Sequence, residues 1–184
     1  MACDISRGKN DLACKNAVSG LKAIYFTNYD DYGFVTTSNS GSGHILTSTG
    51  SLDEVFKYEL KNSGNTFQQD ITSNRDNGTT FYNQALNFVL TKLSKEMEFQ
   101  VKMMAWGRPQ IFVEMNTGQM FLMGKNHGCE IGGNSAIGGT MDSLNGYTLT
   151  ATGMEPEPIY YLDTASIAGV KGAASNDNIT DEAV

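Results

Sequence analysis

The most regular pattern in this chain is an alternation of apolar and polar residues, which is the period of a half-buried β-strand. It is strict in residues 56–60, where Phe56, Tyr58 and Leu60 alternate with Lys57 and Glu59. The same period returns on both sides of an Asp-Asn-Gly turn and an Asn-Thr-Gly turn, and such turns join neighbouring antiparallel strands. The segments that carry it are 67–71, 81–93, 111–115, 119–123 and 144–154.

Two other segments depart from this alternation. Residues 21–27 contain a continuous apolar run, Ala-Ile-Tyr-Phe, which predicts another strand. Residues 94–105 place Met97, Val101 and Met104 at i, i+4 and i+7, which is the period of a helix. Ser94 is a suitable N-cap for that helix, which is the one helix that the pattern predicts.

The single tryptophan, Trp106, stands where this predicted helix ends. Gly107, Arg108 and Pro109 follow it and restart an extended path. A large aromatic residue at such a corner is expected to anchor the core, and a contact between subunits is the alternative interpretation.

The remaining segments are polar or rich in glycine. We interpret residues 1–19 as an N-terminal arm, 37–51 as a long surface loop, 124–140 as a glycine-rich connection and 163–184 as a flexible, acidic C-terminal tail. The sequence thus predicts one domain over residues 1–184, with its core in 20–162. The expected fold is mainly β: an antiparallel β-sandwich or partly open barrel with one flanking α-helix.

The net charge of the chain limits the classes of partner that it is expected to bind. The chain has 13 basic and 20 acidic residues among its 184, a net charge of −7. Proteins that grip nucleic acid use Lys and Arg to displace counterions from phosphates, so this balance argues against tight DNA binding. An acidic surface can still enclose DNA that has to slide, because like charges repel.

The cysteine content and the hydropathy pattern indicate the cellular compartment expected for the protein. Of the three cysteines, Cys3 and Cys14 are able to pair across a short loop, whereas three reduced thiols are expected for a protein made in the cytosol. Residues 1–16 lack the apolar stretch of a signal peptide, and the chain has no run of 18 apolar residues that would span a membrane.

Candidate chemistry is sparse. His127-Gly128-Cys129 invites a Cys–His nucleophile, but Cys129 is better read as a small packed residue. Glu155 and Glu157 form an acidic pair that we interpret as solvated turn residues. Gly133 to Thr140 mimics a phosphate-binding loop, but Gly139 stands where the lysine is needed. We therefore expect no catalytic, cofactor or metal site, and a protein that is not an enzyme.

The order of features from Phe67 to Leu162 resembles bacteriophage tail tube (major tail) proteins. The resemblance is carried by FQQDITSNRDNGTTFYNQ (67–84), LNFVLTKL (86–93), MAWGRPQIFVE (104–114), FLMGKNHGCEI (121–131) and LNGYTLTATGMEPEPIYYL (144–162). It covers about 95 residues closely and most of the chain loosely.

This resemblance implies a structural virion protein in the phage tail, made in the host cytoplasm. Such subunits form hexameric rings that stack into a hollow tube, contact other tail proteins and let DNA pass without sequence-specific binding. Tube proteins line the bore with a continuous sheet, which implies a lumen built from strands near 66–92. Combined with the acidic balance, it makes Glu59, Asp70 and Asp76 candidate lumen-facing residues.

The resemblance also implies loops that bridge successive rings. The candidate inter-ring residues lie in the Ser/Gly-rich loop: Ser38, Ser40, Gly41, Gly43 and His44. Two alternatives stay open. One is another virion component of similar architecture, such as a neck or terminator protein or the inner tube of a contractile injection machine. The other is a secreted β-sandwich binding module, carbohydrate-binding or adhesive, which a signal peptide or an exposed aromatic platform would favour.

Overall fold

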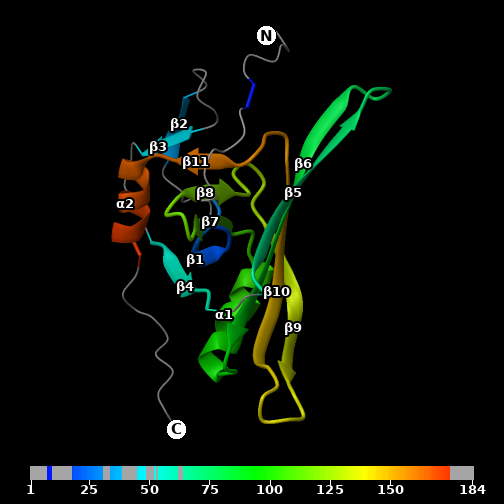
Figure 1. Cartoon of the computed structure of the whole chain (residues 1–184), viewed down its shortest axis with the longest axis vertical. Helices are drawn as coiled ribbons and strands as arrows, with labels where there is room; N and C mark the ends of the chain where they lie inside the picture. Colours follow the sequence, from blue (N-terminus) through cyan, green and yellow to red (C-terminus); the bar gives the residue numbers. More distant parts are fainter. Residues whose placement is uncertain are drawn as a thin grey trace.

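The computed structural model describes residues 8–9, 18–30, 34–38, 45–48, 52, 54–61 and 64–174. The fold is mainly β, as predicted: the strands form two sheets, and helices flank these sheets (Figure 1). The large sheet has seven strands in the spatial order β2 (Phe34–Ser38), β3 (Ile45–Ser48), β11 (Tyr160–Leu162), β8 (Met120–Met123), β7 (Gln110–Met115), β1 (Leu21–Thr27) and β4 (Phe56–Glu59). Its neighbouring strands are antiparallel except for β3 and β11, which are parallel.

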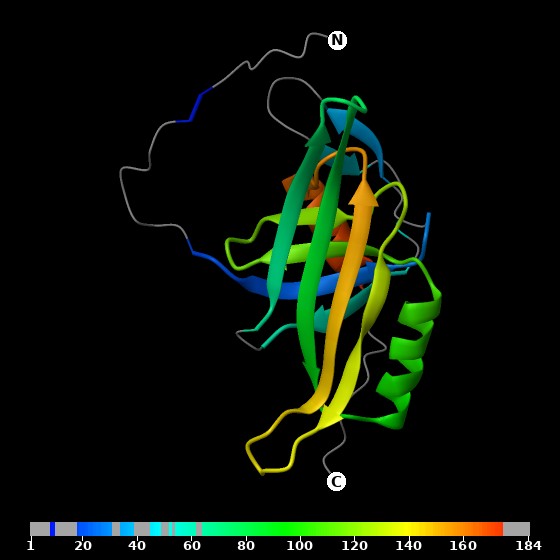
Figure 2. The same cartoon turned by 90° about the vertical axis from the view of Figure 1, so that its right-hand side faces the viewer.

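The small sheet has four strands in the order β5 (Thr66–Asn74), β6 (Thr79–Thr91), β10 (Asn145–Glu155) and β9 (Glu130–Ile137). Every neighbouring pair in it is antiparallel. The strands of the large sheet run across those of the small sheet, so the two sheets pack crosswise (Figure 2).

The large sheet is the middle layer of the molecule, which explains its continuous apolar runs. In β1, Ile24 and Phe26 face the core shared with the small sheet, whereas Ala23 and Tyr25 face a second core. That second core is closed by α2 (Thr164–Gly172), whose Val170 is fully buried. A strand buried on both faces has no polar face, so its sequence shows a run instead of an alternation.

The predicted helix is confirmed as α1 (Lys95–Trp106). The Ser94 Oγ atom accepts a hydrogen bond from the Met97 N–H at 3.1 Å, the geometry of an N-cap. Met97 and Met104 are buried against the core between the sheets, as their spacing predicted. The helix lies beside β9, at one edge of the small sheet (Figure 2).

The small sheet is longer than the layer behind it. The β5–β6 hairpin projects past the large sheet at one end, and the loop between β9 and β10 projects at the other (Figures 1 and 2). Residues 70–80 of the hairpin are all exposed. The molecule therefore presents a sheet whose two ends extend beyond its own core.

Three segments differ from the sequence prediction. Residues 163–172, expected in a flexible tail, form α2 with its Asp163 N-cap, because Ser166 and Val170 pack into the second core. The expected loop 37–51 contains the end of β2 and all of β3, because Leu46 is buried and β3 pairs with β11. The glycine-rich connection contains β9, which pairs along its whole length with β10.

Candidate functional site

The face of the small sheet that points away from the large sheet is open and polar. Its members alternate with the buried residues of the same strands: Thr66, Gln68 and Asp70 on β5, Asn83, Ala85, Asn87 and Val89 on β6, Thr148, Thr150 and Thr152 on β10, and Glu130, Gly132 and Asn134 on β9. These residues are exposed or half-buried. We call this surface the open face.

Side-chain hydrogen bonds run across the open face from strand to strand. The Thr150 hydroxyl donates to Asn87 Oδ1 at 2.7 Å, and Asn87 Nδ2 donates to Thr66 Oγ1 at 3.3 Å. These contacts join β10, β6 and β5 in one row. Cross-strand pairs of this kind hold the polar side chains flat on the sheet instead of leaving them extended into solvent.

The open face is acidic without being strongly charged. The four strands of the small sheet contain no Lys, Arg or His. Asp70 and Glu130 are the carboxylates on the open face, and both are exposed. The surface offers hydrogen-bonding groups and negative charge, but no cation that would hold a phosphate.

Both lateral edges of the small sheet, β5 on one side and β9 on the other, have no further strand paired to them in the described part of the chain. They are similar in length, with nine residues in β5 and eight in β9. An edge strand presents unpaired N–H and C=O groups and is a template for pairing with another chain.

The predicted lumen-facing residues fall in three different places. Asp70 lies on the open face and accepts a hydrogen bond from Gln68 Nε2 at 2.9 Å. Asp76 lies in the exposed turn at the tip of the β5–β6 hairpin. Glu59 lies on β4 of the large sheet, 2.8 Å from Lys57 Nζ, and this hydrogen bond lowers its pKa. The structure therefore does not bring Glu59 together with Asp70.

Glu130 is an open-face residue that the sequence prediction missed. It lies within the glycine-rich stretch 124–140 that we expected to be a connection, and it is the first residue of β9. Its pairing opposite Thr152 of β10 places it on the same face as Asp70. A strand signal for β9 was present only as the Glu-Ile pair that opens it and the Ala-Ile pair that closes it.

The candidate inter-ring loop is only partly within the described residues. Ser38 is the last residue of β2 and pairs with Ile45 of β3. Ser40, Gly41, Gly43 and His44 lie outside the described residues. The predicted N-terminal arm also lies mostly outside them, with both Cys3 and Cys14.

The His127–Cys129 pair does not have the geometry of an activated nucleophile. Cys129 is fully buried, and desolvation with the nearby Glu155 carboxylate raises the pKa of its thiol, which keeps the thiol protonated. His127 Nδ1 instead lies 3.6 Å from Glu155 Oε2. Cys129 packs among apolar residues of the main core.

Glu155, expected to be a solvated turn residue, is buried at 3% exposure. Its Oε1 atom accepts hydrogen bonds from the backbone N–H groups of Asn126 at 3.0 Å and His127 at 2.8 Å. It thereby fixes the turn after β8, which explains why a carboxylate is tolerated there.

Among the described residues, no group of three or more His, Cys, Asp or Glu side chains is arranged to hold a metal ion.

Trp106 is not the core anchor that we expected, because it is 73% exposed. Lys102 Nζ lies 4.2 Å from the centre of its ring on the same helix. The corner between helix and strand is filled instead by Pro109, which is buried. The indole thus belongs to the surface of the molecule.

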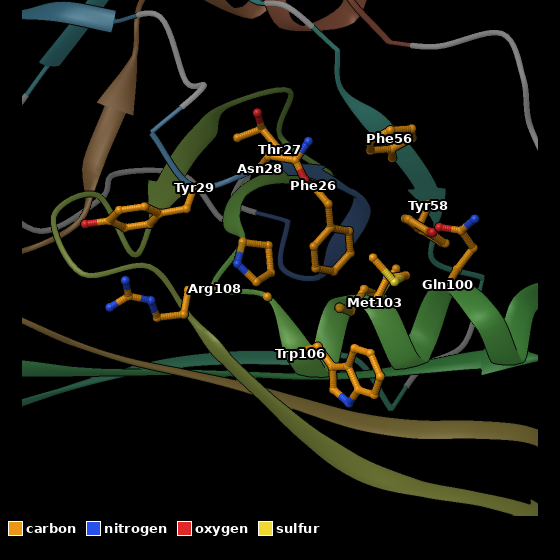
Figure 3. A pocket seen from close by; sticks show the side chains of 13 residues that line it. Phe26, Thr27, Asn28, Tyr29, Phe56, Tyr58, Gln100, Met103, Trp106 and Arg108 are labelled. Atoms are coloured by element: carbon orange, nitrogen blue, oxygen red, sulfur yellow. The ribbon is translucent and has the colours of Figure 1, made fainter.

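Beside Trp106 is a pocket of about 350 Å³ lined mainly by aromatic and apolar side chains. We call it the aromatic pocket; it lies between α1, the end of β1 and the start of β4 (Figure 3). In its wall, Phe26 packs edge-on against Tyr58, with ring centres 5.3 Å apart. Thr27 Oγ1 also lies in this wall, buried and with no hydrogen-bond partner among the described residues.

In the described part of the chain, no helix is both long and apolar enough to cross a bilayer. In comparisons with known proteins, the chain matches no protein-family model, no curated protein and no solved structure.

Proposed function

We propose that this chain is a structural subunit that assembles with copies of itself into stacked rings, forming a hollow tube through which DNA passes. The observation that carries the proposal is the open face: a broad, polar, acidic sheet surface without a basic residue, extended beyond the core at both ends. The sequence resemblance to bacteriophage tail tube proteins supports the same function and gives the expected number of six copies per ring.

The free edges of the small sheet support lateral assembly. Its strands alternate in direction from β5 to β9, so β5 and β9 run antiparallel to each other. A rotation about an axis parallel to the strands therefore brings β5 of one copy beside β9 of the next in antiparallel orientation. Repeating this head-to-tail contact closes a ring and removes every free edge of the small sheet.

The projecting ends of the small sheet support stacking. Ile71, near the tip of the β5–β6 hairpin, is 66% exposed. At the opposite end, Ile137 is 77% exposed and Met141 is fully exposed. Apolar side chains at both ends of one sheet are suited to contacts between successive rings, since burying them is favourable by about 25 cal/mol per Å².

The charge of the open face suits a bore for DNA. A wall with Asp70 and Glu130 and without Lys or Arg repels phosphates and provides no counterion-releasing contact. The Thr and Asn side chains keep the wall hydrated. The duplex is then enclosed without being held, which is the property required for rapid passage.

The proposal is tested by concentrating the purified chain, measuring its mass by light scattering and imaging it by negative-stain electron microscopy. We expect rings or tubes with a central channel. A monomer that persists at high protein concentration, with no polymer in images, would contradict self-assembly. Rings that do not stack would instead favour a neck or terminator component of the same virion.

A second candidate function is carbohydrate binding, favoured by the exposed Trp106 beside the half-exposed Tyr29 and Phe56. Sugars bind to aromatic faces, but Trp106 already carries Lys102 over its ring, and Arg108 lies 4.8 Å from the ring centre of Tyr29. Binding of soluble oligosaccharides, measured by calorimetry, would favour this function over assembly.

A further inference from the structure

An apolar stripe on α1 faces solvent in the described structure. Phe99, Met103 and Trp106 follow each other at i, i+4 and i+7, and they are 57%, 48% and 73% exposed. This spacing places them on one side of the helix, opposite the buried Met97 and Met104. We call these three residues the helix stripe.

The helix stripe is continuous with the aromatic pocket, because Met103 and Trp106 belong to both (Figure 3). Phe56, which is 36% exposed, extends the apolar surface across the pocket to β4. Monomeric proteins rarely expose contiguous apolar surface of this kind unless it meets a partner. The unpaired Thr27 hydroxyl in the same wall is a second sign that the pocket is incomplete.

The position of this surface identifies the partner. β1 crosses the molecule behind the small sheet, with its start behind β5 and its end on the side of α1 (Figure 2). The aromatic pocket lies at the end of β1, on the side of the β9 edge. A copy that places its β5 beside this β9 brings the start of its own β1 toward the pocket.

We propose that the aromatic pocket and the helix stripe of one copy bind the segment 18–21 of the next copy, together with its β7–β8 turn. This inference rests on the proposed function, since it describes the outer layer of the same head-to-tail contact. The occupant is a second copy of this chain, and each copy contributes the pocket on one side and the segment on the other.

The segment is suited to this role because it presents the apolar side chains of Val18 and Leu21 and is fixed in place. Val18 is 63% exposed, and Leu21 is half-buried. Asn116 in the β7–β8 turn donates its backbone N–H to the Gly20 carbonyl at 3.0 Å and its side-chain Nδ2 to the Ser19 carbonyl at 3.1 Å. An ordered segment costs less conformational entropy on binding than a free one.

Trp106 is the only tryptophan, so tryptophan fluorescence reports on this surface alone. We expect the emission to shift to shorter wavelength when the full chain assembles, because the indole leaves water. A benzophenone amino acid at position 106 should then cross-link to residues 18–21 or 115–118 of another chain, located by mass spectrometry. The same photoreactive residue at Ala168, exposed on α2 behind the large sheet, is the matched control and should not reach this segment.

A charge exchange gives an independent readout. Trp106→Glu and Val18→Lys each alter an exposed residue, so both monomers should fold, as circular dichroism would show. Each should raise the protein concentration required for assembly by at least about tenfold, since an aromatic anchor carries much of an interface's energy. The double variant should recover most of that loss, because the new charges attract across the contact.

The outcomes separate this inference from the proposed function. Cross-links from position 106 to another segment of a second copy, or normal assembly of Trp106→Glu, would overturn the inference while self-assembly stands. A chain that stays monomeric at every concentration would overturn both. An emission shift caused by oligosaccharide, with no assembly, would assign the pocket to sugar instead.

Discussion

At the scale of single residues, Glu114 is a carboxylate in the middle of the large sheet, 1% exposed. Its Oε2 atom accepts from the Tyr25 hydroxyl at 2.8 Å, and its Oε1 atom contacts Lys22 Nζ at 3.1 Å and Lys171 Nζ at 2.9 Å. Burial alone would raise the pKa of Glu114, but the hydrogen bonds from Lys171, Tyr25 and Lys22 outweigh it and hold the pKa below its usual value. The cluster ties β7 to β1 and α2.

Glu114→Gln should therefore lower the free energy of unfolding at pH 7 by about 1–3 kcal/mol, because the charged hydrogen bonds are lost. A lowered folded-state pKa stabilises the protein above the unfolded value of 4.5, and this contribution disappears as the pH falls through the folded-state pKa. Urea titrations between pH 7 and pH 3 should show that the difference in unfolding free energy from the wild type shrinks as the pH falls.

Glu54→Gln, at an exposed site, is the control and should stay within about 0.5 kcal/mol of the wild type at each pH. An equal deficit at pH 7 and pH 3 would contradict the role assigned to the carboxylate.

The identity of a residue predicts its burial well only when its partners lie nearby in the sequence. Met97 and Met104 were placed correctly because the helix period itself fixes their face. Trp106 and Glu155 were placed wrongly, since burial of each depends on elements far away in the chain. The size of an indole favours burial and the charge of a carboxylate favours exposure, and tertiary contacts overrode both.

At the scale of elements, the β2–β3 hairpin is the place to test the predicted inter-ring loop. β3 belongs to the large sheet, where Leu46 is buried, so removing residues 38–50 would remove a core strand. Replacing only residues 39–44 with Asn-Gly should preserve the hairpin, because this dipeptide forms a tight two-residue turn.

We expect this shortened chain to keep the thermal stability of the wild type and to lose its ability to form long tubes. Differential scanning calorimetry and electron microscopy measure the two properties separately. A matched control replaces residues 39–44 with six residues of glycine and serine, which keeps the length. Tubes of normal length from the shortened chain would show that this loop does not bridge rings.

Most elements could be predicted from the sequence, because alternation and helix period are local signals. The strands β2, β3, β9 and β11 and the α2 helix could not. In β9 two consecutive glycines interrupt the pattern, and only the pairing with β10 makes the segment a strand. In α2 the residues are mostly small, so its amphipathic period is weak, and its packing against the large sheet stabilises it.

The candidate site could be predicted only in part for a related reason. Alternation tells which residues of one strand share a face, and so it placed Asp70 among the solvent-facing residues of β5. It does not tell which sheet a strand joins. Glu59 was assigned to the lumen with Asp70 and Asp76 because of the acidic balance and the resemblance to tail tube proteins, yet β4 joins the large sheet.

At the scale of the whole molecule, the charge of the open face should control how an assembled tube interacts with DNA. Asp70→Lys with Glu130→Lys should give tubes that bind duplex DNA at 0.01 M salt, where the Debye length is about 30 Å, and much less at 0.15 M, where it is about 8 Å. Filter binding at both salt concentrations measures this.

The matched control, Glu54→Lys with Glu59→Lys, changes the net charge equally but places the new charges on β4 of the large sheet and two residues before it. We expect weaker DNA binding from this control, with a shallower dependence on salt. The sequence predicted that Glu59 faces the lumen. Comparing the two double variants therefore also tests whether Glu59 or the open face meets the DNA. Equal binding by both variants would mean that total charge, and not the open face, sets the interaction.

In the proposed assembly, the open face of the small sheet lines a bore that is closed by pairing β5 of one copy with β9 of the next. A cryo-electron microscopy map of the assembled chain at side-chain resolution tests it most directly. We expect a continuous antiparallel barrel with Asp70, Thr150 and Glu130 facing the channel and α1 outside it. An assembly in which these residues face outward, or in which the β5 and β9 edges stay unpaired, would contradict the account.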